Sequence, residues 1–148
     1  MPKKSSPKYL FDLHAVIKAL SGGNNLVRSA FISGLESGEV LIQRSVSKEL
    51  KDVDEDVYKD FQLVNPGRVY QSEGAKHASV QQALQQKYGT NFWGNSPRPS
   101  CFLSVAMSTC EDLILVTDGR PLSDCRKIVK DCSLATKVFS LPDFAAAV

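Results

Sequence analysis

The sequence predicts a three-layer α/β/α domain with a mostly parallel central sheet. Short apolar runs typical of strands alternate along the chain with segments whose apolar residues recur at helical spacing. The clearest run, Leu113–Thr117, is almost entirely apolar, as expected of a parallel strand covered on both faces. The 148 residues are enough for one core, so we expect a flexible tail at 1–7 and a single domain at 8–148.

The elements of the first half follow from apolar spacing and from turn residues. Ser45 is the expected N-terminal cap of the third helix, and Gly38 is the expected stop of the second. Residues 61–64 are ambiguous, and a turn is expected after them. In chain order we expect a strand at 8–12, helices at 13–20 and 26–37, a strand at 40–42, a helix at 45–50, and a solvated helix or loop at 52–60.

The second half continues the alternation of strands and helices. Gln and Lys dominate its first helix, which is therefore expected to lie on the surface, whereas the second is apolar and is expected to be buried. In chain order we expect a helix at 73–88, a loop at 89–99, a helix at 102–107, a strand at 113–117, a helix at 123–129, and a strand at 137–141 followed by a terminal turn.

Composition and charge narrow the classes of protein that fit. The net charge of +2 and the pI of about 8.3 neither require nor exclude a nucleic-acid partner. The longest apolar stretches fall well short of the roughly 20 residues of a membrane helix, and no signal-peptide pattern follows the basic N-terminus. The four cysteines lack zinc-site spacing and are expected to be reduced and mostly buried. We therefore expect a cytoplasmic protein without membrane segments.

Three acids are expected at the edge of the sheet where its strands end. Asp12 ends the first strand, Glu49 lies on the helix after the second, and Asp118 follows Thr117 at the end of the strongest strand. Ligands of open parallel sheets collect at this edge. Converging carboxylates favour a hard divalent cation, Mg²⁺ or Mn²⁺, which supports phosphodiester hydrolysis. The three acids are thus candidate metal ligands and catalytic residues, with Thr117 in a supporting role.

Each acid also has a purely structural interpretation. Asp12 can simply cap the first helix, because Asp is common at that position. Glu49 can be a solvated charge within a Lys-Glu-Leu-Lys run, and Asp118 can be a turn residue before Gly119. Their shared placement at strand ends is what favours a common site.

Several cations and aromatic residues are candidates for contact with nucleic acid. Phosphate contacts are expected from cations near the acids, and base stacking from Phe92 and Trp93. The alternative is that these cations are ordinary surface residues and that Trp93 packs on the core. The candidate phosphate-binding residues are Arg44, Lys48, Arg98, Arg120 and Lys127.

Four segments resemble the PIN domain family, in particular its single-domain bacterial and mobile-element branch. They are YLFDLHAVI, VLIQRSVSKELKD, LILVTDGRPLSDC and KVFSLPDF, and together they span most of the chain. The resemblance implies a PIN-like fold and a Mg²⁺- or Mn²⁺-dependent endoribonuclease, often the toxin of a toxin–antitoxin pair. It also implies RNA as substrate, an antitoxin-like protein as partner, and a homodimer.

The sequence departs from the family pattern at three places. Ser100 or Cys101 stands where the family usually places another Asp, and Gly119 stands where its late acid often falls. His14 occupies a position beside the first acid where a small polar residue is common, so it is a candidate weak ligand or base. The acidic site is therefore degraded relative to the family.

These observations leave three hypotheses. The first is a metal-dependent ribonuclease, and the second is a PIN-like module that has lost catalysis and binds RNA or a protein partner. The third is an unrelated α/β domain. The sequence contains no P-loop, no G-x-S-x-G elbow and no H-E-x-x-H zinc helix, which argues against those enzyme classes.

Overall fold

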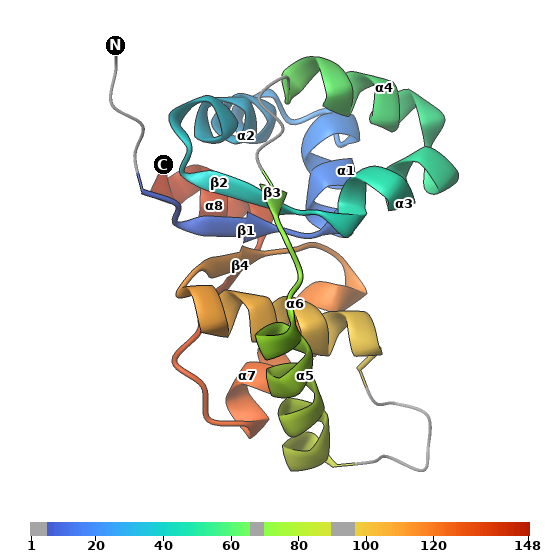
Figure 1. The fold of residues 1–148 in the computed structure, drawn as a ribbon. Coiled ribbons are helices and arrows are strands. Elements are labelled where there is room, and N and C mark those ends of the chain that lie inside the picture. The colour runs from blue at the N-terminus through green and yellow to red at the C-terminus, as the bar shows by residue number, and fades with distance from the viewer. Residues whose placement is uncertain (1–5, 66–69, 90–96) are drawn as a thin grey trace.

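The computed structural model describes residues 6–65, 70–89 and 97–148, and in these ranges the chain forms five strands and eight helices. All strand pairs are parallel, and the strand order is β3-β2-β1-β4-β5. Helices α1 to α4 and α8 cover one face of the sheet, and α5, α6 and α7 cover the other (Figure 1). The predicted three-layer α/β/α fold with a parallel sheet is confirmed.

The elements in chain order are short strands joined by helices. The strands are β1 (Tyr9–Phe11), β2 (Val40–Gln43), β3 (Tyr70–Gln71), β4 (Ile114–Val116) and β5 (Val138–Phe139). The helices are α1 (Leu13–Ser21), α2 (Asn25–Ser37), α3 (Ser45–Val53), α4 (Glu55–Val64), α5 (Ala75–Tyr88), α6 (Pro99–Glu111), α7 (Arg120–Asp131) and α8 (Leu141–Ala147).

The structure corrects the sequence-based elements in five places. Strand β3 was not expected, because two residues are too few for a periodic signal. Helices α6 and α7 begin at Pro99 and Arg120, each three residues before the predicted start, because proline suits the first helical turn. The terminal turn is instead helix α8, and the capping role of Ser45 is wrong, since Arg44 occupies the cap position and makes no side-chain capping bond.

Other local predictions are confirmed. Gly38 ends α2 in the left-handed conformation with φ of 84°, which glycine adopts without strain. All four cysteines are free, and three of them are buried. Of the expected tail, residues 6 and 7 are exposed, and residues 1–5 lie outside the described ranges. None of the helices in the described part of the chain is long and apolar enough to cross a membrane.

The two faces of the sheet are packed differently. On the face of α1 and α2, Phe11 stacks on Phe31 with ring centroids 4.8 Å apart and meets Phe144 of α8 edge-on at 4.9 Å. On the opposite face the core consists of smaller side chains from α6, α7 and β4, including Val105 and Cys125. Buried apolar side chains cover both faces of the sheet, which explains why the central strands are apolar throughout.

The register of the strands determines which residues meet at the edge where they end. Phe11 of β1 lies beside Ile42 of β2 and Val116 of β4, so the residues that follow these strands emerge side by side. The chain runs outward from β1 to β2 and β3, and β4 and β5 lie on the other side. The boundary between β1 and β4 is therefore the switch point at which open α/β sheets bind ligands.

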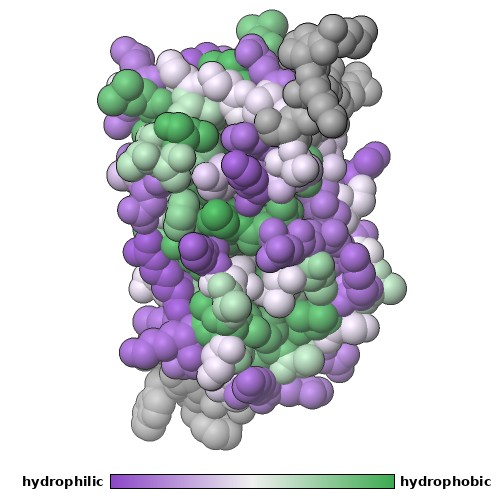
Figure 2. Space-filling model, turned by 90° about the vertical axis from the view of Figure 1, so that its left-hand side faces the viewer, coloured by the Kyte–Doolittle hydropathy of each residue, from purple (hydrophilic) through white to green (hydrophobic). Residues whose placement is uncertain are grey.

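The opposite edge, where the strands begin, faces the reader in Figure 2. Apolar and polar side chains are interspersed there, with apolar areas in the middle and lower parts of the view. The two pockets described below are lined instead by residues at or beyond the strand ends, including Asp12 after β1 and Arg44 after β2.

Candidate functional site

Asp12 sits at the switch point, held by two hydrogen bonds. Its Oδ1 accepts a hydrogen bond from the backbone N–H of Ala15 at 2.9 Å, which confirms that it caps α1. Its Oδ2 accepts a hydrogen bond of 2.5 Å from the hydroxyl of Thr117, the residue that follows β4. Asp12 is only 6% exposed, so both its position and its orientation are fixed by the fold.

Burial raises the pKa of Asp12 above its ordinary value. The hydrogen bonds from Thr117 and Ala15 and the proximity of His14 oppose this rise without cancelling it. Among the described residues no cationic side chain forms an ion pair with Asp12. A buried carboxylate in this situation is stabilised when a cation binds beside it.

Asp12 and Glu49 line the same small pocket, which we call the acid pocket. Its volume is about 90 Å³, and β1, β2, α3, α6 and α7 or the residues beside them contribute to it. Two carboxylates from distant parts of the chain thus meet at the predicted edge of the sheet. The polar residues that line the acid pocket are Asp12, His14, Gln43, Ser45, Glu49, Ser100, Cys101 and Ser104.

The third predicted acid, Asp118, does not line the acid pocket. It is half-buried and precedes Gly119, whose φ of 67° marks a turn. Within the described ranges no three His, Cys, Asp or Glu side chains come close enough to hold a metal ion. Asp12, His14 and Glu49 therefore line one pocket, and Asp118 does not line it.

The acid pocket offers the donor set for one hard cation. Mg²⁺ commonly uses one or two carboxylates and completes its shell with waters and substrate phosphates. Asp12 and Glu49 supply the carboxylates, and Gln43 and Ser100 add neutral oxygens to the same pocket. A second metal does not fit this set, because the pocket contains no third acid.

The sites of the missing family acid belong to the acid pocket. Both Ser100 and Cys101, which stand where the PIN family usually has Asp, line it. Cys101 is 5% exposed, and Ser100 is exposed in the first turn of α6. Both positions at which the resemblance implies another acid therefore line the acid pocket.

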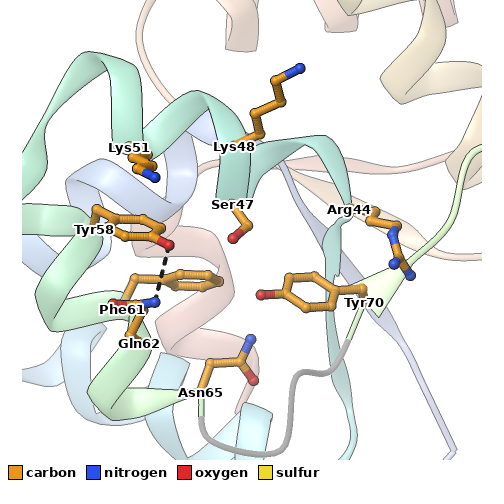
Figure 3. Close-up of a pocket in the computed structure, with 9 residues that line it drawn as sticks. All are labelled: Arg44, Ser47, Lys48, Lys51, Tyr58, Phe61, Gln62, Asn65 and Tyr70. Carbon is orange, nitrogen blue, oxygen red and sulfur yellow. Dashed lines mark hydrogen bonds between the residues drawn. The ribbon is translucent and has the colours of Figure 1, made fainter.

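A larger pocket on the other side of α3 was not anticipated from the sequence. We call it the basic pocket; it has a volume of about 700 Å³ (Figure 3). Arg44 and Lys48, both predicted to contact nucleic acid, line it. The remaining residues that line it are Ser47, Lys51, Tyr58, Phe61, Gln62, Asn65 and Tyr70. The aromatic residues could not be assigned to a pocket, because β3, which carries Tyr70, gave no sequence signal.

Helix α3 separates the two pockets. Ser45 and Glu49, four residues apart, line the acid pocket, whereas Ser47, Lys48 and Lys51 line the basic pocket. Residues four apart lie on the same face of a helix. Ser45 and Glu49 therefore share one face of α3, and Ser47 and Lys51 share another.

The other predicted phosphate contacts do not line either pocket. Arg98 is exposed at the start of α6, and the Nε of Arg120 lies 3.6 Å from Oδ2 of Asp124. Lys127 lines a separate, open hollow of about 350 Å³ on α7. The predicted stacking residues, Phe92 and Trp93, lie outside the described residues.

Asp124 is a buried acid that the sequence analysis did not identify. It is 5% exposed on α7, beside the fully buried Cys125. Its position in the buried stripe with Cys125 and Ile128 is the signal that could have identified it, since an Asp among core positions is unusual. Asp124 does not line the acid pocket.

No protein-family model matches this chain, and no curated protein matches it. The PIN-like assignment stays a prediction that depends on the four sequence segments.

Proposed function

We propose that this chain is a PIN-like, metal-dependent ribonuclease that holds one Mg²⁺ or Mn²⁺ between Asp12 and Glu49. The observation that carries the proposal is that these two carboxylates, from β1 and α3, line one pocket at the switch point of a parallel sheet. The exposed cations across α3 support the choice of a polyanionic substrate.

The side chains of the acid pocket have distinct roles in this proposal. Asp12 is the fixed ligand, because Thr117 and the start of α1 hold both of its oxygens in place. Glu49 is exposed and can adjust to a bound ion. A bound divalent cation would neutralise both carboxylates, lower the pKa of a coordinated water, and stabilise the leaving oxygen of the cleaved phosphodiester.

A second candidate function is RNA binding without cleavage. It is favoured by one observation: serine and cysteine, not a carboxylate, occupy the part of the acid pocket at the start of α6. Fewer carboxylates weaken the binding of a hard cation. The antitoxin-like partner and the homodimer stay predictions that rest on the resemblance.

The experiment is cleavage of a mixed RNA pool by the full chain with Mn²⁺ or Mg²⁺, with a chelator as blank. Asp12→Asn keeps the capping geometry but removes the charge, so cleavage should fall by at least about 100-fold. Equal cleavage by both proteins would reject the nuclease and favour the binding module if RNA is still bound.

Asp118→Asn tests the third predicted acid in the same assay. Because Asp118 lies outside the acid pocket, we expect this variant to cleave RNA within about threefold of the wild type, a change typical of a surface position. A loss of cleavage as large as that of Asp12→Asn would show that Asp118 is part of the catalytic site.

A further inference from the structure

The basic pocket combines aromatic walls with a size suited to a small ligand. Phe61 is almost fully buried and forms the floor, and the ring of Tyr70 packs against it at a centroid distance of 6.4 Å and an angle of 52°. Tyr58 and Tyr70 are only half-buried, so part of each ring faces the pocket (Figure 3). A volume of about 700 Å³ lies within the range of about 300–1,000 Å³ typical of ligand pockets.

Polar groups capable of specific hydrogen bonds also face the basic pocket. The hydroxyl of Ser47 points towards its middle and makes no hydrogen bond to any other side chain or backbone group in the described ranges (Figure 3). Gln62 donates from Nε2 to the hydroxyl of Tyr58 at 3.0 Å, which leaves its carbonyl oxygen as an acceptor. The edge of a nucleobase carries donors and acceptors that such groups can satisfy.

The rim of the basic pocket is positively charged and lacks acids. Arg44, Lys48 and Lys51 are exposed, and none of them forms an ion pair within the described ranges. In Figure 3 Lys48 points away from the centre of the pocket and Arg44 lies beside Tyr70, so these charges surround the cavity rather than fill it. Among the described residues that line the pocket, none is acidic.

The neighbouring helix shows that this lack of pairing is local. On α4, Lys59 lies 3.8 Å from Glu55, and Asp60 receives two hydrogen bonds from Arg28 at 2.7 and 2.9 Å. Three of the four charged residues of α4 thus have partners, whereas Arg44, Lys48 and Lys51 remain available for an external anion. Phosphate groups bind where exposed cations lack acidic partners.

We propose that the basic pocket binds one nucleotide of single-stranded RNA. The base lies against Tyr70 and Tyr58, and the backbone phosphates lie against Arg44, Lys48 and Lys51. This inference deepens the proposed function and rests on it in one respect, the identity of the polymer. Lys48 lines the basic pocket and its neighbour Glu49 lines the acid pocket, so a nucleotide seated here places a neighbouring phosphate near Asp12 and Glu49.

Stacking on the tyrosines requires a base that is not already stacked in a duplex, which is why the ligand is single-stranded. A free nucleotide carries the same base and phosphate chemistry. We therefore compare the affinity for adenosine monophosphate with the affinity for a single-stranded RNA of about 12 nucleotides. This comparison shows whether the pocket binds a free nucleotide or a nucleotide within RNA.

The test measures RNA binding by fluorescence anisotropy with the full chain, in a chelator so that no cleavage occurs. Tyr70→Ala should weaken binding by about tenfold or more because the stacking face is lost. Tyr70→Phe keeps that face and should bind within about twofold of the wild type. Circular dichroism and thermal melts establish that each variant is folded.

A pair of charge variants tests the phosphate contacts independently of Tyr70. Lys51→Gln should lower the slope of log affinity against log salt by about one unit. Lys59→Gln removes the same charge from α4, outside the pocket, and should change the slope much less. Both lysines are exposed, so neither variant is expected to unfold the protein.

The outcomes distinguish the two proposals. RNA bound equally well by the wild type, Tyr70→Ala and Lys51→Gln would overturn the pocket as the nucleotide site and leave the nuclease proposal standing. Binding of adenosine monophosphate without any binding of RNA would overturn RNA as the source of the nucleotide, and the proposed function with it. Binding of neither ligand overturns both.

Discussion

The two pockets that flank α3 differ in how their charges are held. In the acid pocket Asp12 is 6% exposed and both of its oxygens accept hydrogen bonds from fixed donors. In the basic pocket Arg44, Lys48 and Lys51 are exposed and have no ion-pair partner within the described ranges. One helix thus separates a site with one fixed, buried carboxylate from a site whose cations are all exposed.

The two pockets are suited to different roles because their charges differ in burial. A buried and prepositioned carboxylate is suited to chemistry, because little reorganisation is needed when a cation binds. Exposed cations are suited to attracting a polyanion such as RNA. Because they act by electrostatic attraction, which salt screens, such binding should weaken as the salt concentration rises.

The largest expected effect separates two neighbours on α3. Glu49→Gln should lower kcat for RNA cleavage by about 100-fold, because it removes one of two carboxylates that hold the cation. Lys48→Gln should instead raise KM about fivefold through a lost phosphate contact. Steady-state kinetics of both variants provide the measurement, and the same kinetic change in both would remove the distinction between the pockets.

The next effect concerns stability. Thr117→Val removes the hydroxyl that donates to Oδ2 of Asp12 in a buried site, so the free energy of unfolding should fall by about 2 kcal/mol. Ser47→Ala in the basic pocket should change it by less than about 0.5 kcal/mol, since Ser47 makes no side-chain hydrogen bond to another described residue. Urea unfolding of both variants tests the contrast; equal costs would show that the two pockets are held alike.

A third change adds the missing acid to the acid pocket. Ser100→Asp places a carboxylate in the first turn of α6, where the helix dipole favours a negative charge. We expect Mn²⁺ to bind about tenfold more tightly, as measured by calorimetry. Ser100→Asn has the same shape without the charge and should show no gain. A gain in both variants, or in neither, would argue against a cation site beside Ser100.

The smallest effect is a dependence of stability on pH. Because burial raises the folded-state pKa of Asp12 above its unfolded value of about 3.9, the folded protein holds this proton more tightly. The contribution of Asp12 to the free energy of unfolding should fall as pH rises from about 3.9 through the folded pKa.

Asp12→Asn removes this contribution and supplies the reference for that measurement. The stability of the variant relative to the wild type should increase across the same pH window and then level off, as followed by urea unfolding. A constant difference would show that Asp12 does not titrate differently in the folded protein.

Strong local patterns account for the parts of the fold that could be predicted. The apolar run at Leu113–Thr117 and the helical spacing of residues 13–20 predicted β4 and α1 because both segments are buried in a regular way. Helix α4 was ambiguous, since only Val57 and Phe61 of its ten residues are fully buried. Strand β3 has two residues and is specified by its pairing with β2.

Part of the candidate site could likewise be predicted from the sequence, and part could not. Asp12 and Glu49 could be predicted, because each follows a strand whose direction the α/β pattern implies. Asp118 also follows a strand, but it does not line the acid pocket, and the alternation of strands and helices does not distinguish it from Asp12. The basic pocket could not be predicted, since Tyr70 meets α3 and α4 only through the tertiary fold.

The alternation of strands and helices and the parallel sheet covered on both faces could be inferred from the amino-acid sequence. These features depend on residue spacing within single elements, which local sequence contains. The tertiary structure alone decided which strand ends converge, which acid is left outside the pocket, and that an aromatic cavity forms behind α3. Those outcomes depend on contacts between distant segments, and their geometry is determined by the packing of whole layers.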